Sequence, residues 1–105
     1  MQQDSKRVIE EPNPDDKTVY VGNFEYRFGR MKMYHMACAN LDALHAMADK
    51  IGIARKWFQN IEHHPHYDIS KGKRALAVSL GAVEVSDKVL IRLCYGDLIK
   101  KLIKK

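Results

Sequence analysis

Two short segments of the chain carry both a start and a stop signal for a helix, and the stretches around them are patterned as strands. Asn40 and Gly52 bracket the first segment, and Ser70 and Gly81 bracket the second. Asparagine and serine favour the helix N-cap, and glycine favours the helix end. The predicted helices cover 41–50 and 71–80. Helices this short owe most of their stability to packing, so we expect them to lie on a sheet.

β-Branched and aromatic residues predict strands at 18–21, 31–38 and 82–85. We expect a loop over 24–30, and Pro65 excludes a regular central strand around it because proline cannot donate to a ladder. The 105 residues leave room for one domain. The predicted fold is therefore α/β or α+β, with a small single-layer sheet of three or four strands and two or three helices on one of its faces.

Charge divides the chain into three expected parts. Residues 1–17 hold five acidic and three basic side chains with two prolines, which predicts a flexible acidic tail. Residues 18–86 form the expected domain, and 87–105 the expected basic amphipathic helical extension. That extension is too short for stable membrane anchoring. It could pack on its own domain or form a homo-oligomer with a second copy.

The composition argues for a soluble cytoplasmic protein. With 46% hydrophobic and 30% charged residues the chain is typical of globular domains. It has no apolar run of the roughly 18 residues that a membrane span needs and no signal-peptide pattern. Cys38 and Cys94 lie in no metal or redox spacing, so we expect free thiols in a reducing compartment.

The second predicted helix starts with cations, although the helix dipole favours anions there. Positive side chains at a positive helix end indicate a site for a bound anion such as phosphate. The residues expected to hold it are Lys71, Lys73, Arg74 and Arg55. Arg27, Arg30 and Lys32 could reach the same side. The alternative is that all of them are solvated surface cations.

Acid–base and base-stacking residues flank that helix. His66 could act as a general acid or base on a bound phosphate, with His35 in support, and Asp68 could orient His66 or cap the helix. Tyr67 could pack or hydrogen-bond. Trp57 could stack on a base while Gln59 hydrogen-bonds it, although burial of Trp57 is an equally good interpretation.

Three residues of the histidine-rich loop, His64, His66 and Asp68, would share one face of an extended segment. With His35 from a neighbouring strand they make a reasonable transition-metal set. However, no established metal motif is present, and local hydrogen bonding would also explain the loop. We therefore predict neither a metal nor a cofactor.

Several short blocks of the sequence form a recognisable set. They are Thr18-Val19-Tyr20-Val21, His35-Met36-Ala37, Leu44-His45-Ala46-Met47-Ala48, Ile51-Gly52, Arg55, Trp57-Phe58-Gln59, Pro65-His66-Tyr67-Asp68-Ile69, Lys73-Arg74 and Gly81-Ala82-Val83-Glu84. Together these blocks, which cover about 18–86, resemble one small uncharacterised domain family that is frequent in bacteriophage and bacterial genomes. The resemblance implies a phage or bacterial origin and a recurring set of polar residues, but no activity.

The sequence favours a domain that binds a phosphate-bearing small molecule or a nucleic acid, with histidine-based phosphoester chemistry as a further step. Two other hypotheses stay open. One is a non-enzymatic module that binds a host protein. The other is a metal-dependent hydrolase that uses the histidines and Asp68.

Overall fold

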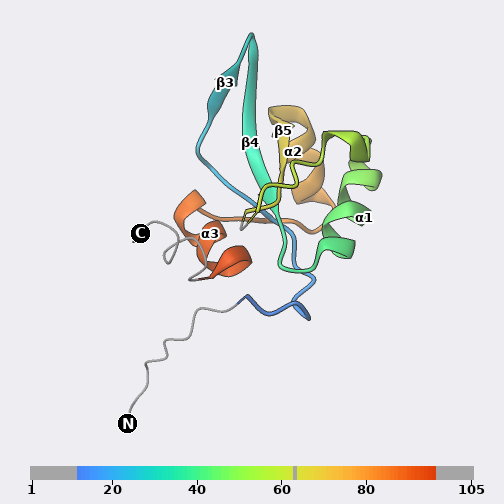
Figure 1. Cartoon of the computed structure of the whole chain (residues 1–105). Coiled ribbons are helices and arrows are strands. Elements are labelled where there is room, and N and C mark those ends of the chain that lie inside the picture. The colour runs from blue at the N-terminus through green and yellow to red at the C-terminus, as the bar shows by residue number, and fades with distance from the viewer. Residues whose placement is uncertain (1–11, 63, 97–105) are drawn as a thin grey trace.

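The computed structural model describes residues 12–62 and 64–96, which form an α+β domain with a mixed five-stranded sheet and three helices (Figure 1). The predicted fold class is confirmed. The strands are β2 (Tyr20–Val21), β3 (Tyr26–Phe28), β4 (Met31–Ala37), β5 (Tyr67–Ser70) and β6 (Val83–Glu84). The helices are α1 (Leu41–Ile51), α2 (Lys71–Ser79) and α3 (Asp87–Tyr95), with a short 3-10 turn η1 at Arg55–Trp57.

Strand β4 is the centre of the sheet. Antiparallel β5 lies along one side of it, and β3 and β2 follow each other along the other side. Strand β6 pairs with β2 in parallel. Because three strands depend on β4, the side chains of β4 decide what each face of the sheet carries.

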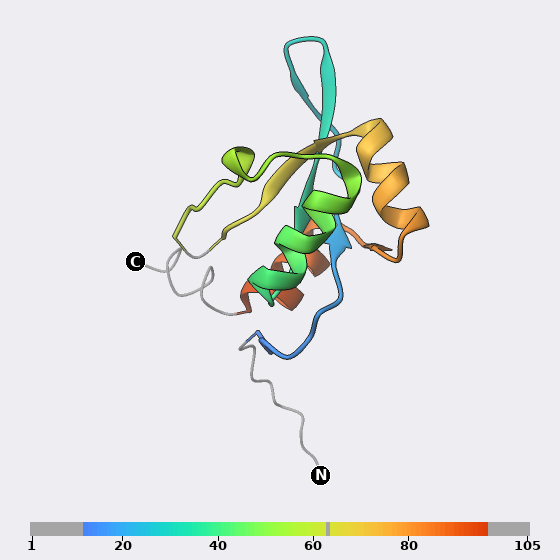
Figure 2. The same ribbon diagram turned by 90° about the vertical axis from the view of Figure 1, so that its right-hand side faces the viewer.

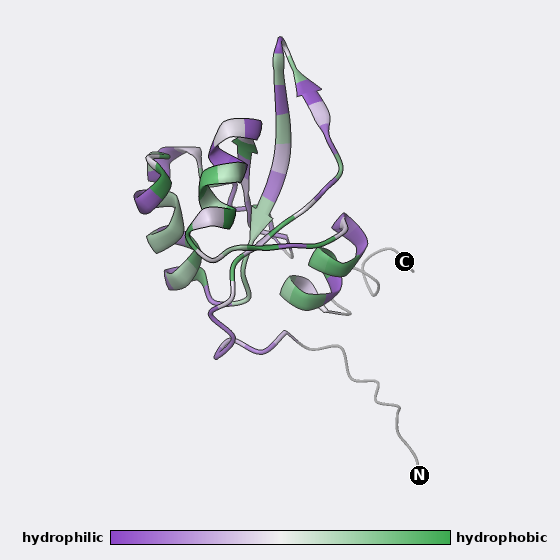
Figure 3. Ribbon diagram, turned by 180° about the vertical axis from the view of Figure 1, so that it is seen from behind, coloured by the Kyte–Doolittle hydropathy of each residue, from purple (hydrophilic) through white to green (hydrophobic). Residues whose placement is uncertain are grey.

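Successive residues of β4 enter different cores. Tyr34 and Met36 are buried against α1 and α2, in a cluster that includes Leu44 and Ala77. Ala37 points the other way and packs against α3. Helices therefore cover both faces of the sheet, where the sequence predicted one face (Figures 1 and 2). The helices carry both hydrophilic and hydrophobic residues in Figure 3.

The predicted caps are confirmed. The Asn40 side chain accepts the Ala43 N–H at 2.8 Å, and the Ser70 hydroxyl accepts the Lys73 N–H at 3.3 Å. Gly52 ends α1 in the left-handed region with φ 81°, a conformation that costs a residue with a Cβ about 1 kcal/mol or more.

Helix α3 packs on the sheet through its buried face. Its N-cap is Ser86, whose hydroxyl accepts the Val89 N–H at 3.2 Å. Leu90, Cys94 and Tyr95 are buried. The rest of the predicted extension and most of the acidic tail lie outside the described residues, as does the proposed oligomer surface. Cys38 and Cys94 are both buried and free.

Two strands occupy stretches where the sequence predicted none. Residues 26–28 form β3, which pairs with β4 across a hairpin whose turn contains Gly29 at φ 64°. Strand β5 begins just after Pro65, so the proline limits the strand without excluding it. Both strands depend on pairing with β4, which local sequence patterns do not report. The hairpin rises well above the body of the domain (Figure 2). None of the described helices is long and apolar enough to cross a membrane.

Candidate metal centre

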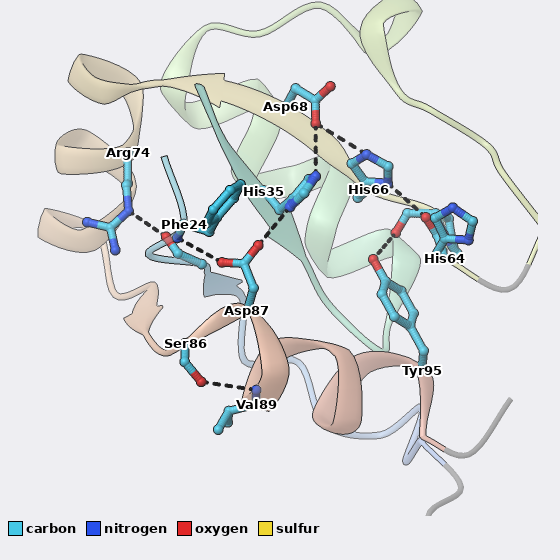
Figure 4. A network of polar contacts seen from close by, with 12 residues as sticks. Phe24, His35, His64, His66, Asp68, Arg74, Ser86, Asp87, Val89 and Tyr95 are labelled. Carbon is cyan, nitrogen blue, oxygen red and sulfur yellow. Dashed lines mark hydrogen bonds and ion pairs between the residues drawn. The ribbon is translucent and has the colours of Figure 1, made fainter. Parts of the chain in front are cut away.

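The pairing of β4 with β5 brings two histidines and one carboxylate to the same point on the sheet. His35 lies directly opposite Asp68, and His66 precedes Asp68 by two residues and so shares its face (Figure 4). Asp68 Oδ1 is 3.2 Å from His66 Nε2 and 3.7 Å from His35 Nε2. One potential ligand atom from each residue lies within 4.8 Å of the others.

Both imidazole rings are held by their other nitrogen. His66 Nδ1 lies 2.8 Å from the His64 carbonyl oxygen. A carbonyl can only accept, so His66 Nδ1 carries the proton. His35 Nδ1 lies 2.9 Å from Asp87 Oδ2, an acceptor when ionised. In the neutral rings both Nε2 atoms therefore present lone pairs to Asp68. Metal-binding histidines are held in the same way, with the second nitrogen donating to a carboxylate or carbonyl.

Asp87 reaches His35 because the chain has no side chain at Gly22. A Cβ built on Gly22 would lie only 2.2 Å from Asp87 Oδ1. The same oxygen accepts the Phe24 N–H at 2.9 Å. On the other side, Arg74 Nε donates to the Gly22 carbonyl at 2.8 Å. The loop after β2 is therefore fixed from both sides, and with it the carboxylate that orients His35.

The charges of Asp68 and His66 depend on each other. Burial disfavours the charged form of Asp68, but the neighbouring His66 and Tyr26 side chains outweigh this and lower its pKa to about 2. Burial lowers the pKa of His66. The Asp68 carboxylate and the His64 carbonyl raise that pKa by a larger amount, so the net pKa of His66 is above its usual value. Gln59 also donates to Asp68 Oδ2. Asp68 is thus ionised at neutral pH.

Two polar atoms at the centre, Asp68 Oδ1 and the Tyr26 hydroxyl oxygen, are buried, and among the described residues neither has a hydrogen-bond partner of regular geometry. Burial, followed by the neighbouring Asp68, raises the pKa of Tyr26, so its hydroxyl stays protonated. Two imidazole lone pairs and a carboxylate repel one another unless a proton or a cation lies between them.

The spacing suits a first-row transition metal. At metal–ligand distances of roughly 2.0–2.1 Å, the ligand atoms of a tetrahedral zinc site lie about 3.3 Å apart. The two separations at Asp68 Oδ1, 3.2 Å and 3.7 Å, bracket that value, and all three ligand atoms lie within 4.8 Å of one another. The His35 and Asp68 side chains are 35% and 25% exposed, which leaves one side of the centre open to solvent. Three protein ligands and an open position are typical of catalytic zinc sites.

A comparison with protein families gives a match over residues 19–95, to the family described as "Protein of unknown function (DUF4031)". The chain belongs to the DUF4031 family. This confirms the expected membership of a domain family without a known function. The match extends through α3 and therefore includes Asp87 together with His35, His66 and Asp68. No curated protein and no solved structure matches the chain.

In this DUF4031 protein the three residues predicted as catalytic, His35, His66 and Asp68, come together. His64 does not supply a ligand atom to them. Its carbonyl holds His66, and its ring meets Tyr95 edge-on at 6.3 Å between centroids.

Three of the four predicted phosphate-binding cations have partners elsewhere in the fold. Lys73 Nζ donates to the Ile51 carbonyl at 2.7 Å, at the end of α1. Arg55 pairs with Asp49 at 3.0 Å. Besides its bond to Gly22, Arg74 stacks over Tyr34 and reaches Glu84 at 3.7 Å. Lys71 is exposed on the first turn of α2.

The remaining predicted residues divide between core and surface. The Tyr67 hydroxyl is buried against His45 Nδ1 at 2.8 Å, so Tyr67 belongs to the core. Trp57 is 61% exposed. Gln59 contacts Asp68 and pairs with His66 through the backbone, at 2.9 Å and 3.1 Å.

Sequence reasoning missed Asp87, Gly22 and Tyr26. Asp87 follows a serine at the start of a helix, where an acidic residue is explained by the helix dipole. Its contact with His35 spans 52 residues of sequence and depends on α3 crossing the sheet. No local signal reports such a contact.

Proposed function

We propose that this protein is a metal-dependent hydrolase that acts on a phosphate ester, with a divalent transition-metal ion held by His35, His66 and Asp68. One observation carries the proposal. Both Nε2 atoms and Asp68 Oδ1 converge, while each ring is held by its Nδ1. These three residues would serve as ligands, and the groups at their Nδ1 atoms would orient the two rings.

The chemistry follows from the donor set. A divalent ion held by the two neutral imidazoles and the Asp68 carboxylate would keep a net positive charge of about one, which would attract an anionic phosphate. The chemistry that such an ion would supply is a water of lowered pKa as the nucleophile for phosphate-ester hydrolysis. Tyr26 stays protonated and can donate a hydrogen bond to a group bound beside Asp68.

The metal replaces the lysines and arginines in holding the phosphate. Lys73, Arg74 and Arg55 already have partners, and leaving those partners would cost their capping, stacking and ion-pair contacts. The metal provides the positive charge where the acid–base residues lie. We also assign the protein to the reducing cytoplasm of bacterial or phage-infected cells, which two buried free thiols support.

The test measures metal affinity and turnover in the same proteins. Wild type, after chelation and dialysis, is titrated with Zn²⁺, Mn²⁺ and Co²⁺, and its hydrolysis of a chromogenic phosphodiester is followed. We expect one metal ion per chain and metal-dependent turnover. Asp68→Asn should weaken metal binding by about 100-fold or more, because loss of a direct ligand exceeds the loss of an outer partner.

Asp49→Asn is the matched control, since Asp49 is an exposed carboxylate whose partner is Arg55. It should bind metal as wild type does. Wild-type protein that takes up no metal, or Asp68→Asn with unchanged affinity, would overturn the metal centre. Metal binding without turnover of any phosphate ester would leave the centre but remove the phosphate-ester hydrolase.

A further inference from the structure

The β3–β4 hairpin exposes large apolar side chains on one face. Phe28 is 74% exposed and Met31 is 49% exposed, and they lie opposite each other in the register. Tyr26 and Met33 are the next pair on the same face. Hydrophobic and hydrophilic residues alternate along the hairpin in Figure 3. So much exposed apolar surface on a projecting hairpin indicates a binding surface.

That apolar face forms one wall of a pocket of about 430 Å³. Trp57 and Ile53 also line this pocket, and Trp57 is largely exposed. The polar groups of the pocket include Gln59 and Lys73. This volume and this mixture of apolar walls with a few polar groups are typical of a site for a small ring system.

The pocket and the metal centre share Asp68. Asp68 lines the pocket and also faces both histidines. Tyr26 lines the pocket, and its ring lies 5.1 Å from that of His35 between centroids. A ring held between Phe28 and Trp57 would therefore place a group attached to it close to Asp68.

The other face of the same hairpin is basic. Arg27 and Lys32 are directly paired in the register and exposed, and the exposed Arg30 lies beside the turn. Side chains alternate across a strand, so these cations face away from the pocket. Lys32 lies 3.9 Å from Glu25, a distance at which an exposed pair contributes little. The hairpin thus offers an aromatic face and a cationic face.

We propose that the hairpin binds single-stranded nucleic acid, with one base stacked in the pocket between Phe28 and Trp57 and flanking phosphates on Arg27 and Lys32. Stacking platforms beside a cationic track are what proteins use for single strands. A single nucleotide in the pocket could not also reach the cations on the opposite face, whereas a strand that wraps the hairpin could. The inference rests on the proposed function only in assigning this strand as the substrate of the metal centre.

The test uses the full chain and a chelator, so that binding is read without the metal. Anisotropy of a labelled deoxythymidine decamer gives the affinity, and the fluorescence of Trp57, which is the sole tryptophan, reports occupancy of the pocket. Phe28→Ser should weaken binding about tenfold or more. Leu80→Ser, at an exposed apolar residue at the end of α2, should bind as wild type does.

The cationic face is tested by salt. Affinity decreases as salt increases, and each phosphate contact on a single strand contributes about 0.7 to the steepness of log affinity against log salt. In the double variant Arg27→Gln/Lys32→Gln this slope should become less steep by about 1.4. Arg92→Gln, an exposed arginine on α3, should leave the slope unchanged.

Several results would overturn the inference. These are no binding of the decamer, equal affinity for thymidine monophosphate and the decamer, or an unchanged affinity in Phe28→Ser. Because every arm is measured with the chelator present, strand binding by a protein that takes up no metal would retain this inference and overturn only the proposed hydrolase.

Discussion

At the level of single residues, the candidate centre depends on groups that touch no ligand position. Arg74 holds the Gly22 carbonyl, Gly22 leaves room for Asp87, and Asp87 holds His35. The contacts of Arg74 with Gly22 and of Asp87 with His35 are half-buried hydrogen bonds, and Gly22 packs closely against Asp87. A side chain added at Gly22 should therefore displace Asp87 and, through it, His35. Asp87 is in this sense a positioning residue.

Gly22→Ala should weaken metal binding by about 10–100-fold, the usual effect of losing an outer partner. The added methyl would lie 2.2 Å from Asp87 Oδ1 and must displace it. Isothermal titration with Zn²⁺ measures the affinity. Asp87→Ala removes the obstructing atoms, so Gly22→Ala combined with Asp87→Ala should bind as weakly as Asp87→Ala alone.

Gly72→Ala is the matched control, because a Cβ there meets nothing within 4 Å. It should leave the affinity for Zn²⁺ unchanged. If the two glycine variants behave alike, or if the effects of Gly22→Ala and Asp87→Ala add, Asp87 does not link Gly22 to His35.

The sequence was sufficient to select His35, His66 and Asp68 but not to decide what they do together. Period-two spacing placed His66 and Asp68 on one face. Whether His35 faced them depended on the β4–β5 register, which is a long-range property of the sheet. The partners of the predicted cations were hidden from the sequence for a related reason. Backbone carbonyls and aromatic rings, which no charge pattern reveals, hold Lys73 and Arg74.

At the level of elements, α1 and α2 were predictable because caps are local. Asn40, Gly52 and Ser70 act within a few residues of themselves. The start of α2 predicts an anion site, since its lysines oppose the helix dipole. In the structure, Lys73 crosses to the C-terminal end of α1, where the dipole is negative, and ties the two helices together.

Lys73→Met should therefore lower the free energy of unfolding by about 1–3 kcal/mol, as expected for a charged hydrogen bond to a helix end. Urea unfolding measures it. Lys71→Met, on the exposed first turn of the same helix, should change stability by less than about 0.5 kcal/mol. Metal affinity should stay the same in both variants. A Lys73→Met protein as stable as Lys71→Met would show that the contact with Ile51 contributes nothing.

At the level of the whole molecule, the two cores meet at β4, and the metal centre lies on the face that α3 covers. Tyr34 and Met36 face α1 and α2, while Ala37 faces α3 on the same side as His35. A domain that ended before Asp87 would lose this second layer and the carboxylate that orients His35. Helix α3 is therefore part of the proposed site as well as part of the fold.

Leu90→Ala separates these two contributions of α3. Leu90 is 2% exposed in the second core, so its truncation should cost about 2–5 kcal/mol. Leu93→Ala, at a position 37% exposed on the same helix, should cost much less.

Zn²⁺ at about 100 times its dissociation constant stabilises the folded state by about 2.7 kcal/mol, which for a domain this size raises Tm by roughly 10 °C or more. Thermal melts should show that increase in wild type and Leu90→Ala alike, and none in Asp68→Asn. An increase in wild type that disappears in Leu90→Ala would mean that metal binding requires α3 to be tightly packed, and that the second core controls the site as well as stabilising the fold.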